Sequence, residues 1–83
     1  MLRDDLLKAV RLALANDWHG AHALAQQYHD PMANWLHAVL HKIEGDAWNS
    51  KYWYAKTNGM DYERYGNARE ELQAIAKDLD ALN

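Results

Sequence analysis

The amino-acid sequence predicts an all-α protein of about five short antiparallel helices, stacked as helical hairpins. Apolar residues recur three and four positions apart through most of the chain, which is the period of an amphipathic helix. No segment alternates apolar and polar residues as a half-buried strand does, and strand-favouring β-branched residues are rare. The expected connections of two to four residues place consecutive helices antiparallel and side by side.

We expect a single domain over residues 1–83. Two hairpin units occupy about 4–58, a linker follows at 59–66, and a capping helix closes the chain at 67–82. A domain of this size buries only about 60% of the surface that its unfolded chain exposes, so its stability should be modest.

The first hairpin is predicted from a stripe of apolar residues and a cap signal. Its first helix is expected at residues 4–15, with Asp4 as the N-terminal cap. The stretch "AND" that follows interrupts the pattern, and Asn16 or Asp17 is expected to cap the second helix. Gly20 costs about 1 kcal/mol relative to alanine inside a helix, which suggests a close crossing with another helix at that point.

The second hairpin begins at "HDP", the clearest boundary in the chain. Asp30 suits an N-cap and Pro31 suits the first helical position, because a helix does not use the N–H group there. The third helix is expected to continue to about Glu44. The fourth is expected to start at its cap, Asp46, and to end at about Asn58.

Two apolar stripes supply much of the predicted core. The third helix is expected to bury Met32, Leu36, Val39, Leu40 and Ile43. The last helix begins at Asn67, which is spaced as a capping box with Glu70 three residues later. Its stripe consists of Ala68, Leu72, Ile75, Ala76, Leu79 and Leu82.

The two hairpins resemble each other in sequence. When "NDWHGAHALAQ" is laid over "GDAWNSKYWYA", the capping aspartates coincide and Ala21 is matched to Ser50 at an offset of 29 residues. A tetratricopeptide unit has about 34 residues. The second hairpin nevertheless resembles such a unit, because a Trp–Leu pair, a Gly-Asp turn and then aromatics with a lysine follow in order. The fold is therefore predicted to be tetratricopeptide-like, or similar to the related Sel1 repeats.

The stretch "WLHAVLHKIEGDAWNSKYWY", preceded by "DWHGAH", also resembles a group of small bacterial all-helical proteins to which no activity is assigned. The resemblance covers roughly residues 16–59. It places nine residues on the shared pattern: His37, His41, Glu44, Gly45, Asp46, Asn49, Tyr52, Trp53 and Tyr54. After Tyr54 the group has a pair of arginines followed by Ala-Gly, where this chain has "AKTN". The resemblance implies a fold and implies no activity.

Composition narrows the function classes. The formal charge of −3 and the mixing of acids with bases leave no basic face of the kind that binds nucleic acid. No apolar run approaches the roughly 20 residues that span a bilayer, and the start "MLRDDLLKAV" does not resemble a secretion signal. Without cysteine there is no disulfide and no thiolate metal site. We therefore expect a cytoplasmic protein that binds neither nucleic acid nor membranes.

His37, His41 and Glu44 occupy positions i, i+4 and i+7 of the third helix, so they form one polar stripe. Two imidazoles and a carboxylate on consecutive turns have the ligand chemistry of a Zn²⁺ or Ni²⁺ site with one position open to water. In the alternative interpretation, both histidines are structural and hydrogen-bond acids or aromatic hydroxyls of the neighbouring helix, with Tyr52 as one candidate.

Three further histidines are expected outside this stripe. His19 and His22 lie on the side of the second helix opposite Leu24 and Tyr28, so we expect them to be solvated. Both would add metal ligands if the second helix lay beside the third. His29 precedes the Asp-Pro boundary and is expected at a helix end, where a positive charge is favourable.

The aromatic residues of the fourth helix cannot all face one core, because Trp48 and Tyr52 lie well around the helix from Tyr54. Either the flanking second and fifth helices cover them, or one aromatic face meets another chain. Tyrosine and tryptophan are enriched at protein interfaces.

The first hypothesis for function is a small non-catalytic module that binds a protein partner or a second copy of itself. Its surface would consist of Trp48, Tyr52 and Trp53, with His37, His41 and Glu44 at the edge. The alternative is a helical bundle that binds a metal or a small ligand at the His37/His41/Glu44 stripe. Only the alternative involves a cofactor, Zn²⁺ or Ni²⁺. No enzymatic activity is expected, because Ser50 is the only serine and no glycine-rich phosphate loop is present.

Overall fold

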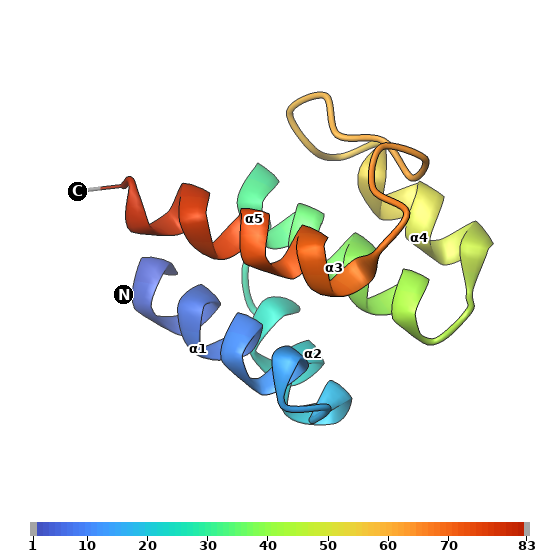
Figure 1. Cartoon of the computed structure of the whole chain (residues 1–83). Coiled ribbons are helices and arrows are strands. Elements are labelled where there is room, and N and C mark those ends of the chain that lie inside the picture. The colour runs from blue at the N-terminus through green and yellow to red at the C-terminus, as the bar shows by residue number, and fades with distance from the viewer. Residues whose placement is uncertain (1, 83) are drawn as a thin grey trace.

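The computed structural model describes residues 2–82, and this part of the chain contains five α-helices and no strand. They are α1 (Leu2–Leu14), α2 (Trp18–Ala25), α3 (Pro31–Ile43), α4 (Ala47–Tyr54) and α5 (Ala68–Asp80) (Figure 1). The predicted all-α class is confirmed. The end residues of the predicted domain, Met1 and Asn83, lie outside the described residues.

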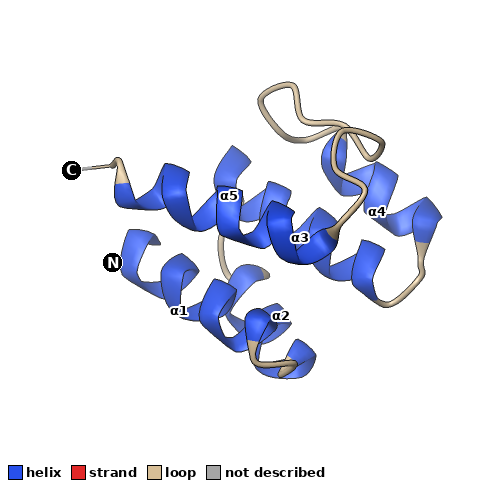
Figure 2. Cartoon of the chain, viewed as in Figure 1, coloured by secondary structure: helices blue, strands red, loops and turns tan. Residues whose placement is uncertain are grey.

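Short loops join the first four helices, whereas a longer loop separates α4 from α5 (Figure 2). α1 packs against α2 and α3 packs against α4, which gives two helical hairpins. α3 also contacts α2, and α5 lies against both α1 and α3 (Figure 1). The last helix therefore closes a core that both hairpins share.

The two hairpins are structural repeats at the offset found in the sequence. The bounds of α1 plus 29 give those of α3, and the bounds of α2 plus 29 give those of α4. The N-caps also agree: Asp17 has φ −93° and ψ 77°, and Asp46 has φ −92° and ψ 79°. Each aspartate accepts a hydrogen bond from the backbone N–H three residues later, at Gly20 and Asn49. The arrangement of tetratricopeptide repeats themselves stays a prediction.

The core lies where α1, α3 and α5 meet. Its fully buried aliphatic side chains are Leu6, Val10, Leu36, Val39, Leu40, Leu72, Ile75 and Leu79. Each contributes roughly 1.5–3 kcal/mol through removal of apolar surface from water. Two predicted core residues are exposed, Ile43 at 44% and Leu82 at 46%, and three others, Met32, Ala68 and Ala76, are partly buried. Leu82 follows the end of α5, and Ile43 lies in the last turn of α3 at the edge of a pocket.

Two helix ends differ from the sequence prediction, and the predicted cap of α3 lacks one expected hydrogen bond. α1 begins at Leu2, so Asp4 lies in the first turn and is not the cap. Its negative charge there interacts favourably with the positive end of the helix dipole. α4 ends at Tyr54 and not near Asn58, because Thr57 interrupts it. The Thr57 hydroxyl donates to the carbonyl of Tyr54 at 2.7 Å and accepts from the N–H of Met60 at 3.0 Å. Asp30 occupies the N-cap of α3 without a capping side-chain hydrogen bond.

Gly20 serves the cap of α2 and not a close helix crossing. A Cβ atom at this position would lie 2.4 Å from a carboxylate oxygen of Asp17. The Asp17 carboxylate lies over the first turn of α2 and occupies the space that a side chain at position 20 would need. The expected helix–helix contact at Gly20 is therefore wrong, and the constraint is local.

A buried lysine anchors the loop between α4 and α5. The Lys42 ammonium on α3 donates to the carbonyls of Tyr62 at 2.7 Å and Tyr65 at 2.9 Å. It also forms an ion pair at 3.0 Å with Glu71 of α5, which is completely buried. These three acceptors match the three donors of the ammonium group. The predicted linker is thus fixed to the core at two carbonyls.

Glu71 completes this network with two further donors. The indole N–H of Trp35 donates to its carboxylate at 2.8 Å, and the Tyr54 hydroxyl donates to the same oxygen. Burial, followed by the hydrogen bond to Glu71, raises the pKa of Tyr54 well above its usual 10. Tyr54 therefore stays a neutral donor, and the buried carboxylate has three partners.

Candidate metal centre

Three histidines meet between α2 and α3. His22 projects from α2, and His37 and His41 lie one turn apart on α3. Each offers a ring nitrogen, and these nitrogens all lie within 4.8 Å of one another. The Nε2 atoms of His22 and His37 are 3.1 Å apart, so one nitrogen donates a hydrogen bond and the other presents its lone pair.

Glu44 orients the third histidine. Its carboxylate lies 2.5 Å from Nδ1 of His41, which places the proton of that nitrogen toward the carboxylate and leaves Nε2 as a potential ligand. A metal-binding histidine typically has this support from a carboxylate on its second nitrogen. Glu44 thus completes the surroundings of the cluster without being one of its three converging ligands.

Two tryptophans hold the rings in place. The indole of Trp18 stacks on His22 at 4.8 Å between centroids, with 10° between planes. Its N–H donates to the carbonyl of Leu40 at 2.6 Å, which fixes the indole against α3. Trp53 of α4 stacks on His37 at 3.9 Å and 12°. The histidine cluster is therefore enclosed by aromatic rings from two different helices.

The electrostatics keep two of the imidazoles neutral. Burial, and then the neighbouring His22 and His41, lower the pKa of His37 from its usual 6.5 to about 4. Burial also lowers the pKa of His22, and His41 adds to the effect. Neutral imidazole is the form that coordinates a metal, so neither ring has to release a proton near pH 7. The ring whose Nε2 donates in the His22–His37 hydrogen bond has to move that proton to its Nδ1 before Nε2 can coordinate.

The structure brings together His37 and His41 of the predicted stripe but replaces its third member. Glu44 contacts His41 only, and His22, which was expected on a solvated face, takes the converging position. A sequence signal for His22 exists, because it lies four residues after Trp18 and so shares its side of α2. His19 is exposed, as expected, whereas His29 lies exposed in the loop between α2 and α3 and not at the end of α2.

The expected hydrogen bond from these histidines to Tyr52 is absent from the described residues. His37 meets Trp53 instead, and His41 meets Glu44. Asp46 lies near His41 and Glu44, but its carboxylate is occupied by the N–H groups of Asn49. Those hydrogen bonds lower the pKa of Asp46, so it is a capping carboxylate.

Two of the aromatic residues of α4 are exposed, and the other two are partly or fully buried. Trp48 is 75% exposed and Tyr52 is 47% exposed, so flanking helices do not cover this face. Their rings stack at 6.1 Å with 13° between planes, and the Lys56 ammonium lies 4.9 Å from the Tyr52 ring. Trp53 is partly buried on His37, and Tyr54 is buried. The predicted partner surface therefore reduces to Trp48 and Tyr52 as its freely accessible residues.

Comparisons with known proteins add no identity: no family model matches the chain, and neither the curated proteins nor the solved structures contain a match. The resemblance to small bacterial helical proteins stays a prediction. Among the described residues, no helix combines the length and the apolar character that a membrane crossing requires. Function is therefore inferred from the side chains themselves.

Proposed function

We propose that this protein is a small helical module that binds a divalent transition metal, Zn²⁺ or Ni²⁺, through His22, His37 and His41. The observation that carries the proposal is the convergence of three imidazole nitrogens within 4.8 Å. Imidazole is a favoured ligand of both ions, and three protein ligands leave one coordination position open.

The spacing of the nitrogens supports a shared ion. With Zn–N bonds of about 2.0–2.1 Å and tetrahedral angles, two coordinating nitrogens lie about 3.3 Å apart. The nitrogens of His22 and His37 are already 3.1 Å apart. The remaining pairs, at no more than 4.8 Å, need to close by at most about 1.5 Å. We expect this movement to come from the His41 side chain, which is partly exposed.

The surroundings also favour coordination over a purely structural contact. The three rings contact one another, and the Glu44 carboxylate binds His41 from the outside. The three imidazoles form one hydrogen bond among themselves, between His22 and His37, and the pKa values of these two rings are lowered. Contacts among the imidazoles therefore contribute little stability. A cation placed between the lone pairs converts this arrangement into a favourable one.

The proposal is tested by thermal unfolding of EDTA-treated protein, followed by circular dichroism, with and without Zn²⁺ or Ni²⁺. At a free metal concentration about 100 times Kd, stabilisation is about 2.7 kcal/mol, or on the order of 10 °C in a domain of this size. His22→Gln and His41→Gln should abolish the shift. His19→Gln is the matched control, because His19 is an exposed residue of the same helix.

The variants distinguish the two metal sites and the absence of one. If His22→Gln keeps the full shift while Glu44→Gln loses it, the ligands are the sequence-predicted His37, His41 and Glu44. If the wild-type protein shows no shift with either ion, the histidines are structural and the proposal is wrong.

A second candidate function is association with a protein partner or with another copy of this chain. The exposed Trp48–Tyr52 pair favours it, because tryptophan and tyrosine concentrate in interface hot spots. Sedimentation velocity over a range of concentrations tests self-association. Trp48→Ala should abolish any increase in size, whereas Lys51→Ala, an exposed residue of the same helix, should not.

A further inference from the structure

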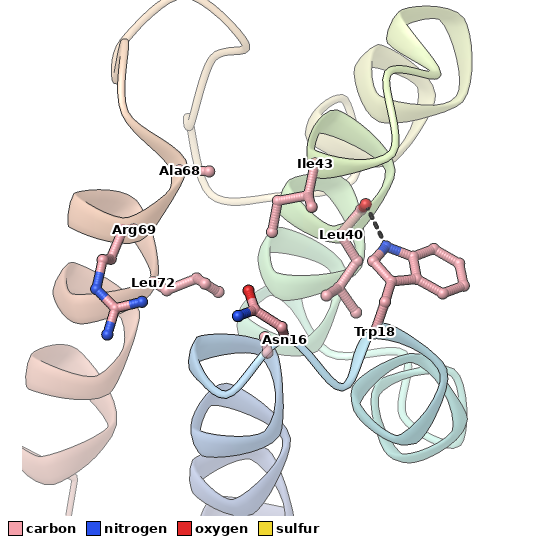
Figure 3. Close-up of a pocket in the computed structure, with 8 residues that line it drawn as sticks. Asn16, Trp18, Leu40, Ile43, Ala68, Arg69 and Leu72 are labelled. Atoms are coloured by element: carbon pink, nitrogen blue, oxygen red, sulfur yellow. Dashed lines mark hydrogen bonds between the residues drawn. The ribbon is translucent and has the colours of Figure 1, made fainter.

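A pocket of about 230 Å³ lies between α1, α3 and α5 (Figure 3), and none of the three histidines lines it. Apolar side chains form most of its wall, including Leu40 and Ile43 of α3 and Leu72 of α5. Trp18 also lines the pocket, while its indole N–H is bonded to the carbonyl of Leu40. The pocket is smaller than the roughly 300–1,000 Å³ that hold drug-sized molecules, so its ligand is small.

Arg69 supplies the one charged side chain among the residues that line this pocket. Its Nη1 donates to the carbonyl of Leu14 at 3.1 Å, which holds the guanidinium over the C-terminal end of α1. No carboxylate of residues 2–82 lies within ion-pair distance of it. Most of its donors are therefore available to a ligand, and a planar guanidinium matches a carboxylate in a bidentate arrangement.

Asn16 adds an uncharged polar group. Its φ of 67° is left-handed, while the equivalent position of the second repeat is Gly45, with φ 83°. Glycine adopts this conformation at the lowest cost, and asparagine is among the few other residues that tolerate it. The first repeat therefore places an amide at a position where the second has no side chain. That amide points into the space between α3 and α5 (Figure 3).

We propose that this pocket binds a small apolar monocarboxylate, such as a medium-chain fatty acid. The carboxylate would pair with Arg69 and accept from the Asn16 amide, and the hydrocarbon chain would cover Leu40, Ile43 and Leu72. A single cation beside apolar walls, with no acidic residue in the lining, suits one negative charge attached to an apolar body. The ligand would also remove apolar surface of Ile43, which is 44% exposed, from water. This inference is independent of the metal site.

The experiment is a titration of the EDTA-treated protein with octanoate, followed by ¹H–¹⁵N NMR. Saturable shifts are expected at the amides of Ala13, Ile43 and Leu72 and at the indole N–H of Trp18, with a Kd of about 1 mM or tighter. Octanol, which has the same chain without the charge, should bind about tenfold more weakly, because a hydrogen bond to a charged group is the stronger one.

Three variants locate the binding. Arg69→Gln should remove the preference for octanoate over octanol, and Arg64→Gln, an exposed arginine outside the lining, should keep it. Asn16→Gly, which copies the second repeat, should weaken octanoate binding a few-fold without destabilising the turn. Ala68→Leu fills the pocket and should block both ligands.

Each contrary result overturns the proposal. Equal affinity for octanoate and octanol removes the role of the charge. Undiminished preference in Arg69→Gln, with unchanged far-UV circular dichroism, places the carboxylate elsewhere. Binding that survives Ala68→Leu, or shifts that do not saturate, mean that the pocket is not the site.

Discussion

Two buried polar clusters on neighbouring faces of α3 differ in how they are satisfied. Lys42 and Glu71 carry opposite charges, and every donor of the ammonium has an acceptor within the chain. The cluster of His22, His37 and His41 joins three groups of the same kind, and one ring nitrogen of each converges on the other two. His41 and Lys42 are adjacent on α3 but differ in this respect. His41 belongs to the cluster that can still bind a ligand, and Lys42 belongs to the cluster whose groups are all paired within the chain.

The difference separates a structural role from a binding role. A buried ion pair with complete hydrogen bonding fixes which helices meet, and it offers nothing to a ligand. Converging imidazoles with lowered pKa values are poor mutual partners but good ligands for a cation. Breaking the two clusters should therefore have different consequences, for stability in the first case and for metal binding in the second.

The largest effect is expected from Glu71→Ala. The substitution leaves the Lys42 ammonium without its counter-charge and the Trp35 indole without its acceptor, so unfolding should become easier by about 3–5 kcal/mol. Urea denaturation at neutral pH measures the change. Glu70→Ala is the control, because Glu70 is an exposed neighbour on the same helix. A loss below about 1 kcal/mol would mean that the ion pair is not structural.

The second prediction concerns acid sensitivity of the histidine cluster. His37 has a pKa of about 4 in the folded protein and about 6.5 when unfolded, so the unfolded chain takes up the proton first. Its contribution to stability is therefore complete above about pH 6.5 and is lost as the pH falls toward 4, by up to about 3 kcal/mol.

Urea unfolding in EDTA across this pH range tests the acid sensitivity. His22 acts in the same direction, whereas the lowered pKa of Asp46 matters only below about pH 4. His37→Gln should flatten the pH dependence, whereas His29→Gln should leave most of it in place, because exposed His29 is the smallest of the contributions that lower the pKa of His37. An unchanged profile in His37→Gln would contradict the assignment of a neutral His37.

Local signals in the sequence were sufficient for much of the fold. The caps at Asp17, Asp46 and Asn67 depend on residues within a few positions of one another, and the repeat offset follows from aligning two segments of the sequence. The structure confirms both. The end of α4 was missed, because the hydrogen bonds of Thr57 to Tyr54 and Met60 compete with the helix in a way that helical periodicity does not register.

The candidate site depended on contacts that no local pattern contains. Glu70 and Glu71 are neighbours of the same type at the start of α5, yet one is exposed and the other is completely buried, because only Glu71 faces Lys42 29 positions away. In the same way, His22 becomes a candidate ligand through the packing of α2 on α3. The sequence predicted two of the three histidines, since they share a helix, and assigned the third to solvent.

A smaller effect, on metal affinity, is expected from Glu44→Gln. This substitution tests whether Glu44 supports the ligand His41 or is a ligand itself. Glu44 supports His41 from outside, so its loss should weaken Zn²⁺ binding about tenfold, as removal of a ligand's hydrogen-bond partner commonly does. Isothermal titration calorimetry measures the affinity, and urea unfolding without metal should change by less than about 1 kcal/mol because Glu44 is exposed. Complete loss of binding would instead make Glu44 a direct ligand.

The smallest effect on stability is expected from Trp48→Ala, which removes a large aromatic residue that touches neither cluster. At 75% exposure the indole contributes little buried area, so unfolding should change by about 0.5 kcal/mol or less, and Zn²⁺ affinity should not change. Trp53→Ala, five residues further along α4, is the matched comparison, because the Trp53 indole stacks on His37. That substitution should destabilise the fold by more than Trp48→Ala does, and it should also weaken metal binding by loosening the His37 ring.

If both variants lower Zn²⁺ affinity equally, the metal site extends onto the exposed face of α4, and the separation between a closed histidine cluster and an open aromatic surface no longer holds.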